Sequence, residues 1–449
     1  MTEAQARTSA GRGRHRARYA DRLFGDGLAL SASAGISAVV GMVSWVIAAR
    51  LMPQAEVGEA SAFVSAFLLI AGFAQMNLGA ALLRWLPRAG NDSATLVLRC
   101  TAVVVATGTA GAAICLVLPW SELIFKASTG STAPSVTGWL IFTAAVVAWV
   151  VLQIQDFALV GLGRAWWATA RNVVVAGLRL AILVALGSGL TAQGAVWSWL
   201  VPLVACAVVL STVLPRLHPR SAPVVGGGTL PARHEVLSFL GPTYVGTVAT
   251  TLLFNQVPLV VTVRFGTETG AAFFIAWQAV TVVEVIAIYF VNGLSSEVAR
   301  APERAAELAR TTRRRLLLLF LPPLALGVLV AAPALGIFGE GYSASAPALR
   351  VLLVGLAFRL VVVHALGVRQ AVGQAMRFAR LQIVTTGLVV LAVLVVPARV
   401  GGDAESILLP VACAYFAVQF CSAVAVLYLD SPTRHARTAS RSRSAIEAE

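Results

Sequence analysis

The stretch ARLMPQAEVG (residues 49–58) is followed by an apolar run that ends in NLGAALLRWLPR (residues 77–88). A degraded copy returns in the second half of the chain as VRFGTETG (263–270), and the apolar run after it ends in NGLSSEVAR (292–300). Two halves with the same order of parts indicate a membrane protein built by duplication, and duplicated membrane proteins are most often transporters.

Apolar residues dominate the whole chain. Hydrophobic residues make up 58% of it and charged residues only 12%, and the apolar residues come in long runs, unlike those of soluble globular proteins. Each run is long enough to cross a hydrocarbon core of about 30 Å as a helix, and the runs do not alternate in polarity as barrel strands do. The sequence predicts an all-α polytopic membrane protein. About twelve transmembrane helices are expected, near residues 28–51, 58–83, 96–119, 138–160, 170–187, 192–213, 238–263, 270–297, 315–337, 347–369, 380–397 and 406–428.

A polar interruption near the middle of the chain separates two sets of spans. Residues 215–235 are rich in proline, glycine and arginine, a composition typical of a linker. We therefore predict two pseudo-symmetric six-helix lobes, at residues 28–214 and 238–429. A cytoplasmic linker at 215–237 would join them, with a basic cytoplasmic tail at 1–27 and a second tail at 430–449.

The formal net charge of +14 follows this predicted topology. Basic residues gather on both tails and on the loops between even and odd spans, whereas the opposite side carries few of them. By the positive-inside rule, both termini should be cytoplasmic in a multi-pass protein of the bacterial cytoplasmic membrane. Basic tails attract anionic lipid headgroups, which favours membrane lipids over nucleic acid as partners.

Several kinds of chemistry are missing from the sequence. A P-loop needs a lysine after glycine, and the single lysine, Lys126, follows Phe125. The histidines are scattered, with only His364 inside a span, and the five cysteines lie in apolar spans without metal-ligand spacing. The predicted external loops are too short for the domain that a membrane-bound glycan polymerase or glycosyltransferase generally needs. We expect no cofactor, no metal and no enzymatic activity.

Two acidic residues inside the predicted spans are candidates for ion coupling, because a charge deep in a bilayer is costly and usually marks a pathway. Glu284 shares a helical stripe with Gln278, Thr281 and Asn292. It could exchange protons or contact substrate, or it could be paired structurally. Asp156 lies nearer the cytoplasmic edge. It could couple protons, or it could pair with Arg164 and Arg171 across the following loop.

Four arginines leave similar alternatives open. Arg179, halfway along a short span, could pair with an acid on another helix such as Asp156. Arg359 lies five residues before His364, so it could belong to a proton relay, or it could snorkel or be paired. Arg50 and Arg264 occupy matching places in the two repeats, and each precedes a Glu-x-Gly turn. We interpret them as anchors at the external interface, paired with Glu56 and Glu268 respectively.

Amide side chains recur in the two repeat halves. Gln75 and Asn77 lie in the second predicted span, and Asn255 and Gln256 lie in the seventh. Each amide alone could be explained by a hydrogen bond between helices. Their placement in both halves makes a polar cavity an equally strong interpretation.

These residues also resemble a known family. The segments WVIAARL (45–51), PQAEVG (53–58), NLG (77–79), LRWLPR (83–88) and QDFALVGLGR (155–164) resemble the polysaccharide-biosynthesis membrane proteins of the O-antigen flippase type. Those proteins belong to the multidrug/oligosaccharidyl-lipid/polysaccharide (MOP) exporter superfamily. The resemblance is clear over residues 30–185, and beyond residue 235 it is mainly one of topology. Its motifs point to the family and not to a substrate.

The resemblance implies a transporter of twelve to fourteen helices, with a central cavity lined by the first two helices of each lobe. It implies a flippase that moves undecaprenyl-diphosphate-linked glycans across the membrane by alternating access. Glycan polymerases and glycosyltransferases are the partners that the resemblance suggests. The diphosphate would meet arginine at the cavity mouth, with Arg84 the first choice. The substrate or cavity residues it suggests are Arg84, Gln75, Asn77, Asn255, Gln256, Gln278 and Asn292, with Glu284 and Asp156 coupling ions.

Other functions stay open at this point. A proton- or sodium-coupled multidrug or metabolite antiporter would have the same architecture. A lipid II flippase is less favoured, because such proteins carry several arginines inside their first and eighth helices, whereas Arg50 lies at a helix end. A glycan-synthesising enzyme and a scaffold that holds such enzymes together are the alternatives outside transport.

Overall fold

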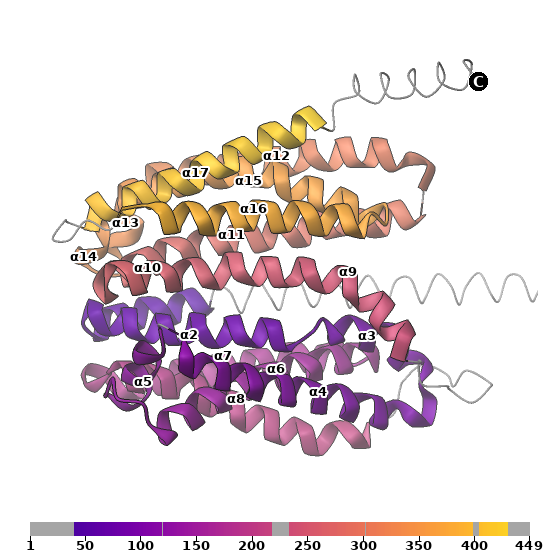
Figure 1. Cartoon of the computed structure of the whole chain (residues 1–449), viewed down its shortest axis with the longest axis horizontal. Helices are drawn as coiled ribbons and strands as arrows, with labels where there is room; N and C mark the ends of the chain where they lie inside the picture. The colour runs from indigo at the N-terminus through magenta and orange to yellow at the C-terminus, as the bar shows by residue number, and fades with distance from the viewer. Residues whose placement is uncertain (1–39, 119, 218–232, 301, 398–403, 430–449) are drawn as a thin grey trace, which may run out of the picture. The chain divides into compact units, whose positions relative to one another are not determined.

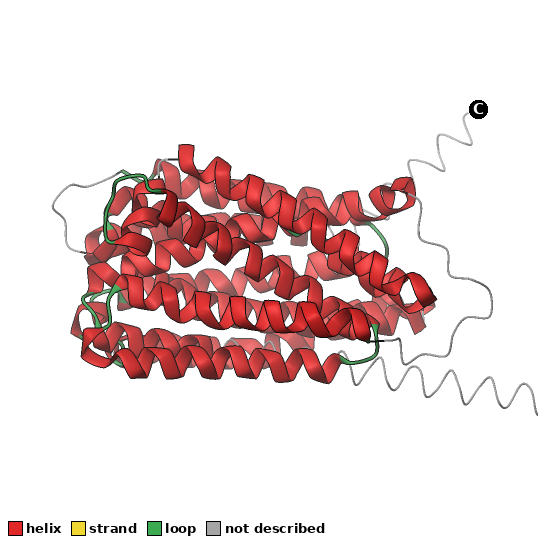
Figure 2. Ribbon diagram, turned by 90° about the horizontal axis from the view of Figure 1, so that it is seen from below, coloured by secondary structure: helices red, strands yellow, loops and turns green. Residues whose placement is uncertain are grey.

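The computed structural model describes residues 40–118, 120–217, 233–300, 302–397 and 404–429. Across these residues the chain is helical throughout, without a β-strand (Figure 2). Ten helices of the described part are long and apolar enough to cross a membrane. The predicted all-α membrane fold is therefore confirmed. The predicted N-terminal and C-terminal tails and most of the linker lie outside the described residues.

The candidate spans follow the predicted ones closely (Figure 1). They are Gln54–Ala74 (α2), Gly90–Ile114 (with α4), Val136–Gly161 (α6), Ala165–Leu186 (α7), Ala192–Arg216 (with α8), Tyr244–Phe265 (with α10), Thr267–Leu294 (in α11), Ala346–Ala371 (α15), Ala375–Val395 (α16) and Ser406–Tyr428 (in α17). Of the first predicted span, the structure describes the shorter helix Val40–Leu51.

The predicted span at 315–337 is divided. It corresponds to α12 (Ala305–Leu329) and α13 (Ala331–Gly336), which meet at Val330. Pro333 has no N–H to donate to the carbonyl of Leu329, four residues earlier, and its ring crowds that carbonyl, which favours an interruption here. The short α14 (Glu340–Ser343) then leads into α15.

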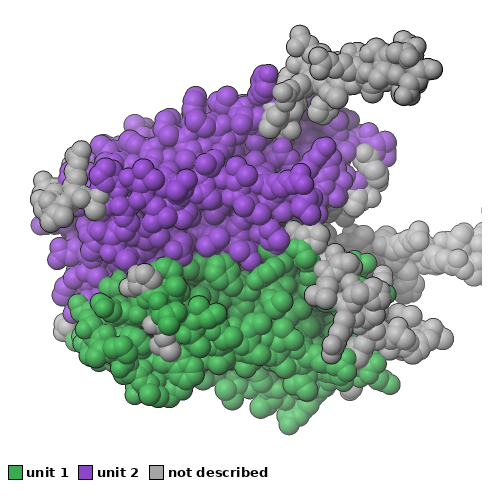
Figure 3. All heavy atoms as spheres, viewed as in Figure 1, with its two compact units in different colours: residues 1–52, 66–244 green, residues 53–65, 245–449 purple. Residues whose placement is uncertain are grey.

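Two compact units make up the described chain (Figure 3). Unit 1 contains the residues up to Met52 together with Ala66–Tyr244, and unit 2 contains Pro53–Ser65 together with the residues from Val245 onward. The first half of α2 thus belongs to unit 2 and its second half to unit 1. The start of α9 (Arg233–Thr251) belongs to unit 1 and its end to unit 2.

Each unit is built around one central helix. In unit 1, α6 packs against α3 (Leu78–Trp85), α4 (Ser93–Ile114), α5 (Ser121–Thr129), α7 and α8 (Ala192–Val213). In unit 2, α15 packs against α11 (Thr267–Arg300), α12, α16 and α17 (Ala404–Leu429). The central helices are mostly buried by protein, whereas α4, α7 and α16 keep apolar faces exposed, as helices facing lipid must.

The two copies of the repeated segment meet inside unit 2. Gln54 Nε2 donates a hydrogen bond of 2.9 Å to the carbonyl oxygen of Glu268. Gly58 lies against the backbone of Thr267, where a Cβ atom would overlap the Thr267 carbonyl. In the second copy, Gly270 lies just as close to Thr262. The glycine of each Glu-x-Gly turn is therefore required by close helix packing.

The predicted pairing of Arg264 with Glu268 is wrong. Arg264 lies in the last turn of α10 (Val257–Phe265), and its guanidinium donates to the carbonyl oxygens of Val393 at 2.7 Å and Val396 at 2.8 Å. These carbonyls end α16 and have no partner within their own helix, so a basic side chain satisfies them well. Arg264 thus fastens α10 to α16.

Candidate functional site

The first pair of predicted cavity amides lies at a break in a helix. The predicted span at 58–83 is interrupted after Ala74 and resumes as α3 at Leu78. Met76 and Asn77 both adopt left-handed backbone conformations, with φ of 49° and 55°. Non-glycine residues in this region carry strain, which folded proteins keep mainly at functional sites. Gln75 and Asn77, both half-buried, are therefore held at a strained point of unit 1.

Side chains from other helices of unit 1 satisfy the carbonyl groups that this break leaves free. The Tyr244 hydroxyl donates to the Phe73 carbonyl at 2.9 Å, and the Thr107 hydroxyl donates to the Ala74 carbonyl at 2.8 Å. Irregular backbone is tolerated at membrane depth only where such partners or a water-filled cavity satisfy it. Broken helices of this kind form the binding sites of many transporters.

The second pair of amides lies at another irregularity, in unit 2. Residues Leu252–Gln256 form a π-turn between α9 and α10. Its cause is Pro258, which removes an N–H donor and crowds the Phe254 carbonyl four residues earlier. The indole nitrogen of Trp277 donates to that carbonyl at 3.1 Å. Because π-turns are frequent at functional sites, the position of Asn255 and Gln256 in this one supports their candidacy.

Trp277 should stabilise the π-turn mainly through this hydrogen bond. We expect Trp277→Phe to lower the stability of the protein by about 1–2 kcal/mol, because the Phe254 carbonyl would be left buried without a donor. The apparent melting temperature of the detergent-purified protein measures the effect. The matched control, Trp166→Phe on an exposed site of α7, should leave it unchanged. An unaffected melting temperature in Trp277→Phe would show that another group satisfies the carbonyl.

Glu284 is part of a buried ion pair. Arg359 Nε lies 2.8 Å from Glu284 Oε1, and the two side chains are 1% and 3% exposed. The pair joins the middle of α11 to the middle of α15, the central helix of unit 2. Of the two interpretations left open for each residue, pairing is confirmed for both. Whether Glu284 also couples ions stays a prediction.

A polar network extends from this pair. Arg359 donates from Nη2 to Gln382 Oε1 at 3.3 Å and from Nη1 to Thr385 Oγ1 at 3.4 Å, both on α16. Gln382 in turn donates to Thr250 Oγ1 at 3.1 Å, near the start of the π-turn. The network thus links α11, α15 and α16 to α9. The sequence singled out Glu284 and Arg359 of this network but missed Gln382, Thr385 and Thr250. The only signal for Gln382 and Thr385 was the spacing of polar residues in α16.

Two further buried polar groups border this network. Tyr415 packs edge-on against Trp277, with the ring centroids 5.2 Å apart, and its hydroxyl has no hydrogen-bond partner within the described ranges. Gln419, one turn later on α17, is fully buried, and neither of its amide atoms has a partner among the described residues. Buried polar groups without partners are rare in folded proteins. They give unit 2 unused hydrogen-bonding capacity beside the ion pair.

Asp156 is also paired. Its carboxylate lies 2.5 Å from Arg171 Nη2, and Arg171 donates further to the Leu152 carbonyl at 3.0 Å. This confirms the predicted pairing across the loop between α6 and α7. The alternative pairing of Asp156 with Arg179 is wrong, because Arg179 lies two turns farther along α7 against the ring of Trp199. Coupling of protons by Asp156 stays a prediction.

The remaining predicted residues are placed as follows. Arg84 is exposed on α3, and its guanidinium lies 5.2 Å from the ring centroid of Trp85. Gln278 is half-buried and Asn292 is exposed. The predicted stripe on α11 is therefore divided, since Glu284 points into the packed interior of unit 2 whereas Asn292 does not.

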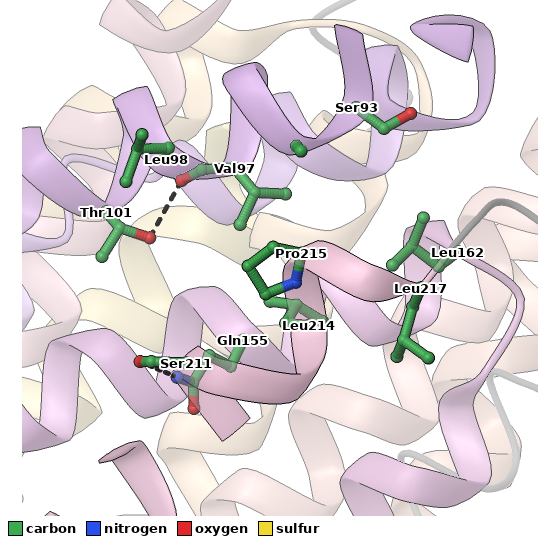
Figure 4. A pocket seen from close by; sticks show the side chains of 11 residues that line it. Ser93, Val97, Leu98, Thr101, Gln155, Leu162, Ser211, Leu214, Pro215 and Leu217 are labelled. Atoms are coloured by element: carbon green, nitrogen blue, oxygen red, sulfur yellow. Dashed lines mark hydrogen bonds between the residues drawn. The ribbon is translucent and has the colours of Figure 1, made fainter. Parts of the chain in front are cut away.

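A separate cavity of about 90 Å³ lies in unit 1, between α4, α6 and the end of α8 (Figure 4). Its walls are mainly apolar. Its polar members are Ser93, Thr101, Ser211 and Gln155. Gln155 donates from Nε2 to the Ala207 carbonyl and to Ser211 Oγ, both at 3.0 Å. None of the predicted substrate or ion-coupling residues lines it. It is therefore not the site that those residues would form.

Comparison with known proteins places the fold. No family model and no curated protein sequence matches the chain. Among solved structures, an inward-facing multidrug resistance MATE family transporter of the MOP superfamily matches with a TM-score of 0.64 and 15% identity, over 88% of this chain and 96% of that one. The outward-facing form of such a transporter matches with a TM-score of 0.55 and 14% identity, over 89% and 94%.

A third neighbour is a MOP superfamily transporter from Pyrococcus furiosus Vc1, described by the reversed polarity of its binding pocket. It matches with a TM-score of 0.61 and 17% identity, over 90% of this chain and 93% of that one. The chain has the MATE fold.

Proposed function

We propose that this protein is a transporter that moves a lipid-linked oligosaccharide or polysaccharide precursor from the cytoplasmic to the outer leaflet by alternating access. The MATE fold supports transport in general, because its structural neighbours are MOP superfamily transporters solved in both inward-facing and outward-facing conformations. The substrate proposal rests on the charges inside the spans.

One observation carries the choice of substrate. Both acidic residues predicted to couple ions, Glu284 and Asp156, are engaged by arginines, at 2.8 Å and 2.5 Å. A carboxylate held by a guanidinium is a poor site for a second cation, because the arginine already neutralises it and cannot be deprotonated. With both carboxylates neutralised, a substrate would meet an arginine such as the exposed Arg84 rather than these acids, which suits an anionic substrate. The reversed pocket polarity described for the Pyrococcus furiosus neighbour is a related variation on the same fold.

The diphosphate of an undecaprenyl-linked glycan is such a substrate. Arginine binds phosphate oxygens with paired N–H donors, and Arg84 lies exposed on α3, directly after the strained break. The half-buried amides Gln75, Asn77, Asn255 and Gln256 would meet the sugar hydroxyls. Membrane lipids, a glycan polymerase and glycosyltransferases are the partners that this function would require.

Glycan export tests the proposal. In cells that lack the gene, lipid-linked glycan should accumulate on the cytoplasmic leaflet, and the wild-type gene should restore export. We expect Arg84→Ala to reduce export by about tenfold or more at unchanged membrane abundance, because a charged hydrogen bond to the diphosphate is lost. Arg377→Ala, at an exposed arginine on α16, is the matched control and should export normally.

An antiporter for cationic compounds is the second candidate, favoured by the multidrug transporters among the neighbours. It predicts that Glu284→Gln stops ion-coupled efflux of a cationic drug. Cells that show a drug-efflux phenotype and normal glycan export would contradict the flippase proposal and support the antiporter.

A further inference from the structure

Arg179 occupies an aromatic enclosure within unit 1. Its guanidinium carbon lies 3.8 Å from the ring centroid of Trp199 on α8 and 5.6 Å from that of Trp45 on the helix Val40–Leu51. The Trp199 ring also contacts the rings of Phe67, at 5.7 Å, and Trp149, at 6.1 Å. Arg179 is 7% exposed. Aromatic faces thus cover the guanidinium, and they provide no hydrogen-bond acceptor in its plane.

The charge of Arg179 has no counter-ion in the described part of the chain. Its Nε is fully buried without a hydrogen bond in that part of the chain, and the contacts of its guanidinium there are with aromatic rings. The other two buried arginines of the spans differ in this respect, since Arg171 has Asp156 and Arg359 has Glu284. An arginine cannot escape burial by losing its proton.

A buried charge without a partner is strongly destabilising, and contact with aromatic rings offsets only part of that cost. A protein that keeps such a group gains most when a ligand supplies the opposite charge. The stacked rings hold the guanidinium by its faces, which leaves the N–H groups at its edge for an anion. That geometry fits oxygens that accept two parallel hydrogen bonds, as phosphate oxygens do.

We propose that Arg179 and the rings of Trp45 and Trp199 form an anion site that binds the phosphate or diphosphate group of an amphipathic lipid ester. This inference rests on the proposed function for the choice of phosphate over other anions. Topology gives the site its role. Arg179 lies seven residues before the end of α7, about 10 Å from it. Arg84 lies near the end of α3, where Leu82 and the following Leu86 pack against Gly161, four residues before α7 begins. Arg179 would receive the anionic headgroup on the far side of the strained break.

Binding of a short polyprenyl diphosphate to the purified protein tests the site. Farnesyl diphosphate should quench tryptophan fluorescence saturably, and farnesol, which has the same chain without the charge, should not. We expect Arg179→Gln to weaken farnesyl diphosphate binding by about tenfold or more, since a charged hydrogen-bonding group is removed. Arg179→Lys should retain part of the affinity, and Arg377→Gln should behave as wild type. Equal binding of farnesol, or unchanged binding in Arg179→Gln, would overturn the proposal.

Thermal stability separates a ligand site from a structural role. If Arg179 awaits an anion, Arg179→Gln without ligand should melt at the wild-type temperature or above it, and the rise caused by farnesyl diphosphate should disappear. A variant that fails to accumulate, or that melts lower and still responds to farnesyl diphosphate, would mean that Arg179 is structural.

The binding test and the export test can fail independently. If deletion of the gene leaves glycan export intact but the protein still binds farnesyl diphosphate through Arg179, the flippase proposal is contradicted and the anion site is supported. Normal glycan export by an Arg179→Gln protein that no longer binds farnesyl diphosphate would show that the site does not serve transport, and the inference as stated would fall.

Discussion

Replacing Glu284 with leucine should destabilise the protein by about 3–5 kcal/mol, because Arg359 would be left buried and charged without its partner. Arg359 is 1% exposed, and its other hydrogen bonds, to Gln382 and Thr385, are long at 3.3 Å and 3.4 Å. They cannot replace a carboxylate. Removing the arginine instead, as Arg359→Met, should cost less, since the buried guanidinium, which cannot lose its proton, has then gone.

A double-mutant cycle measures this coupling. The apparent stabilities of Glu284→Leu, Arg359→Met and the double variant are measured. We expect the double variant to be more stable than Glu284→Leu alone, because the uncompensated charge has gone. If the effects of the two single substitutions add up to the effect of the double variant, a direct ion pair is contradicted. Gln278→Leu, at a half-buried position on the same helix, is a control for the loss of a polar group without a buried charge.

Gly58→Ala should be the most damaging single methyl addition among the helical glycines of the repeat. The new Cβ would overlap the backbone carbonyl of Thr267, and unlike a side chain that carbonyl cannot rotate away. Overpacking typically costs about 1–3 kcal/mol, and we expect the upper end of that range or more here. Protein abundance in the membrane and the melting temperature of the purified protein measure the loss.

Gly387→Ala is the matched control, because this glycine lies inside α16 of unit 2 with open space around its Cα. Alanine is the better helix former by about 1 kcal/mol, so the control should be neutral or slightly stabilising. Comparable losses in Gly58→Ala and Gly387→Ala would mean that the close approach to Thr267 does not matter for folding.

The sequence predicted the helices better than it predicted their interruptions. The long apolar runs gave the spans, but the second one was expected to be continuous from 58 to 83, and it breaks at Gln75–Asn77. No proline or glycine occupies that break, so local preference gave no warning. The break depends on Tyr244 and Thr107, which satisfy the freed carbonyls from other helices. By contrast, Pro333 could have warned of the division of α12 from α13.

For the charged residues, the sequence predicted which ones are unusual but not which partners they have. The sequence identified Asp156, Arg179, Glu284 and Arg359 as unusual because a charge inside an apolar span is costly wherever it points. Spacing along one helix cannot tell which other helix lies opposite, so Asp156 seemed as able to reach Arg179 as Arg171. The packing of α6 against α7 decided in favour of Arg171, and the rings of Trp45 and Trp199 took the place of an acid beside Arg179.

By itself, the sequence determined that this protein is an all-helical membrane protein, because hydrophobic length is a property of the chain that no packing can alter. Tertiary structure alone decided which polar groups are neutralised and which are left available. Pairing depends on distances of a few ångströms between helices far apart in sequence. In unit 2 that packing closes Glu284 onto Arg359, and in unit 1 it leaves the charge of Arg179 among aromatic rings.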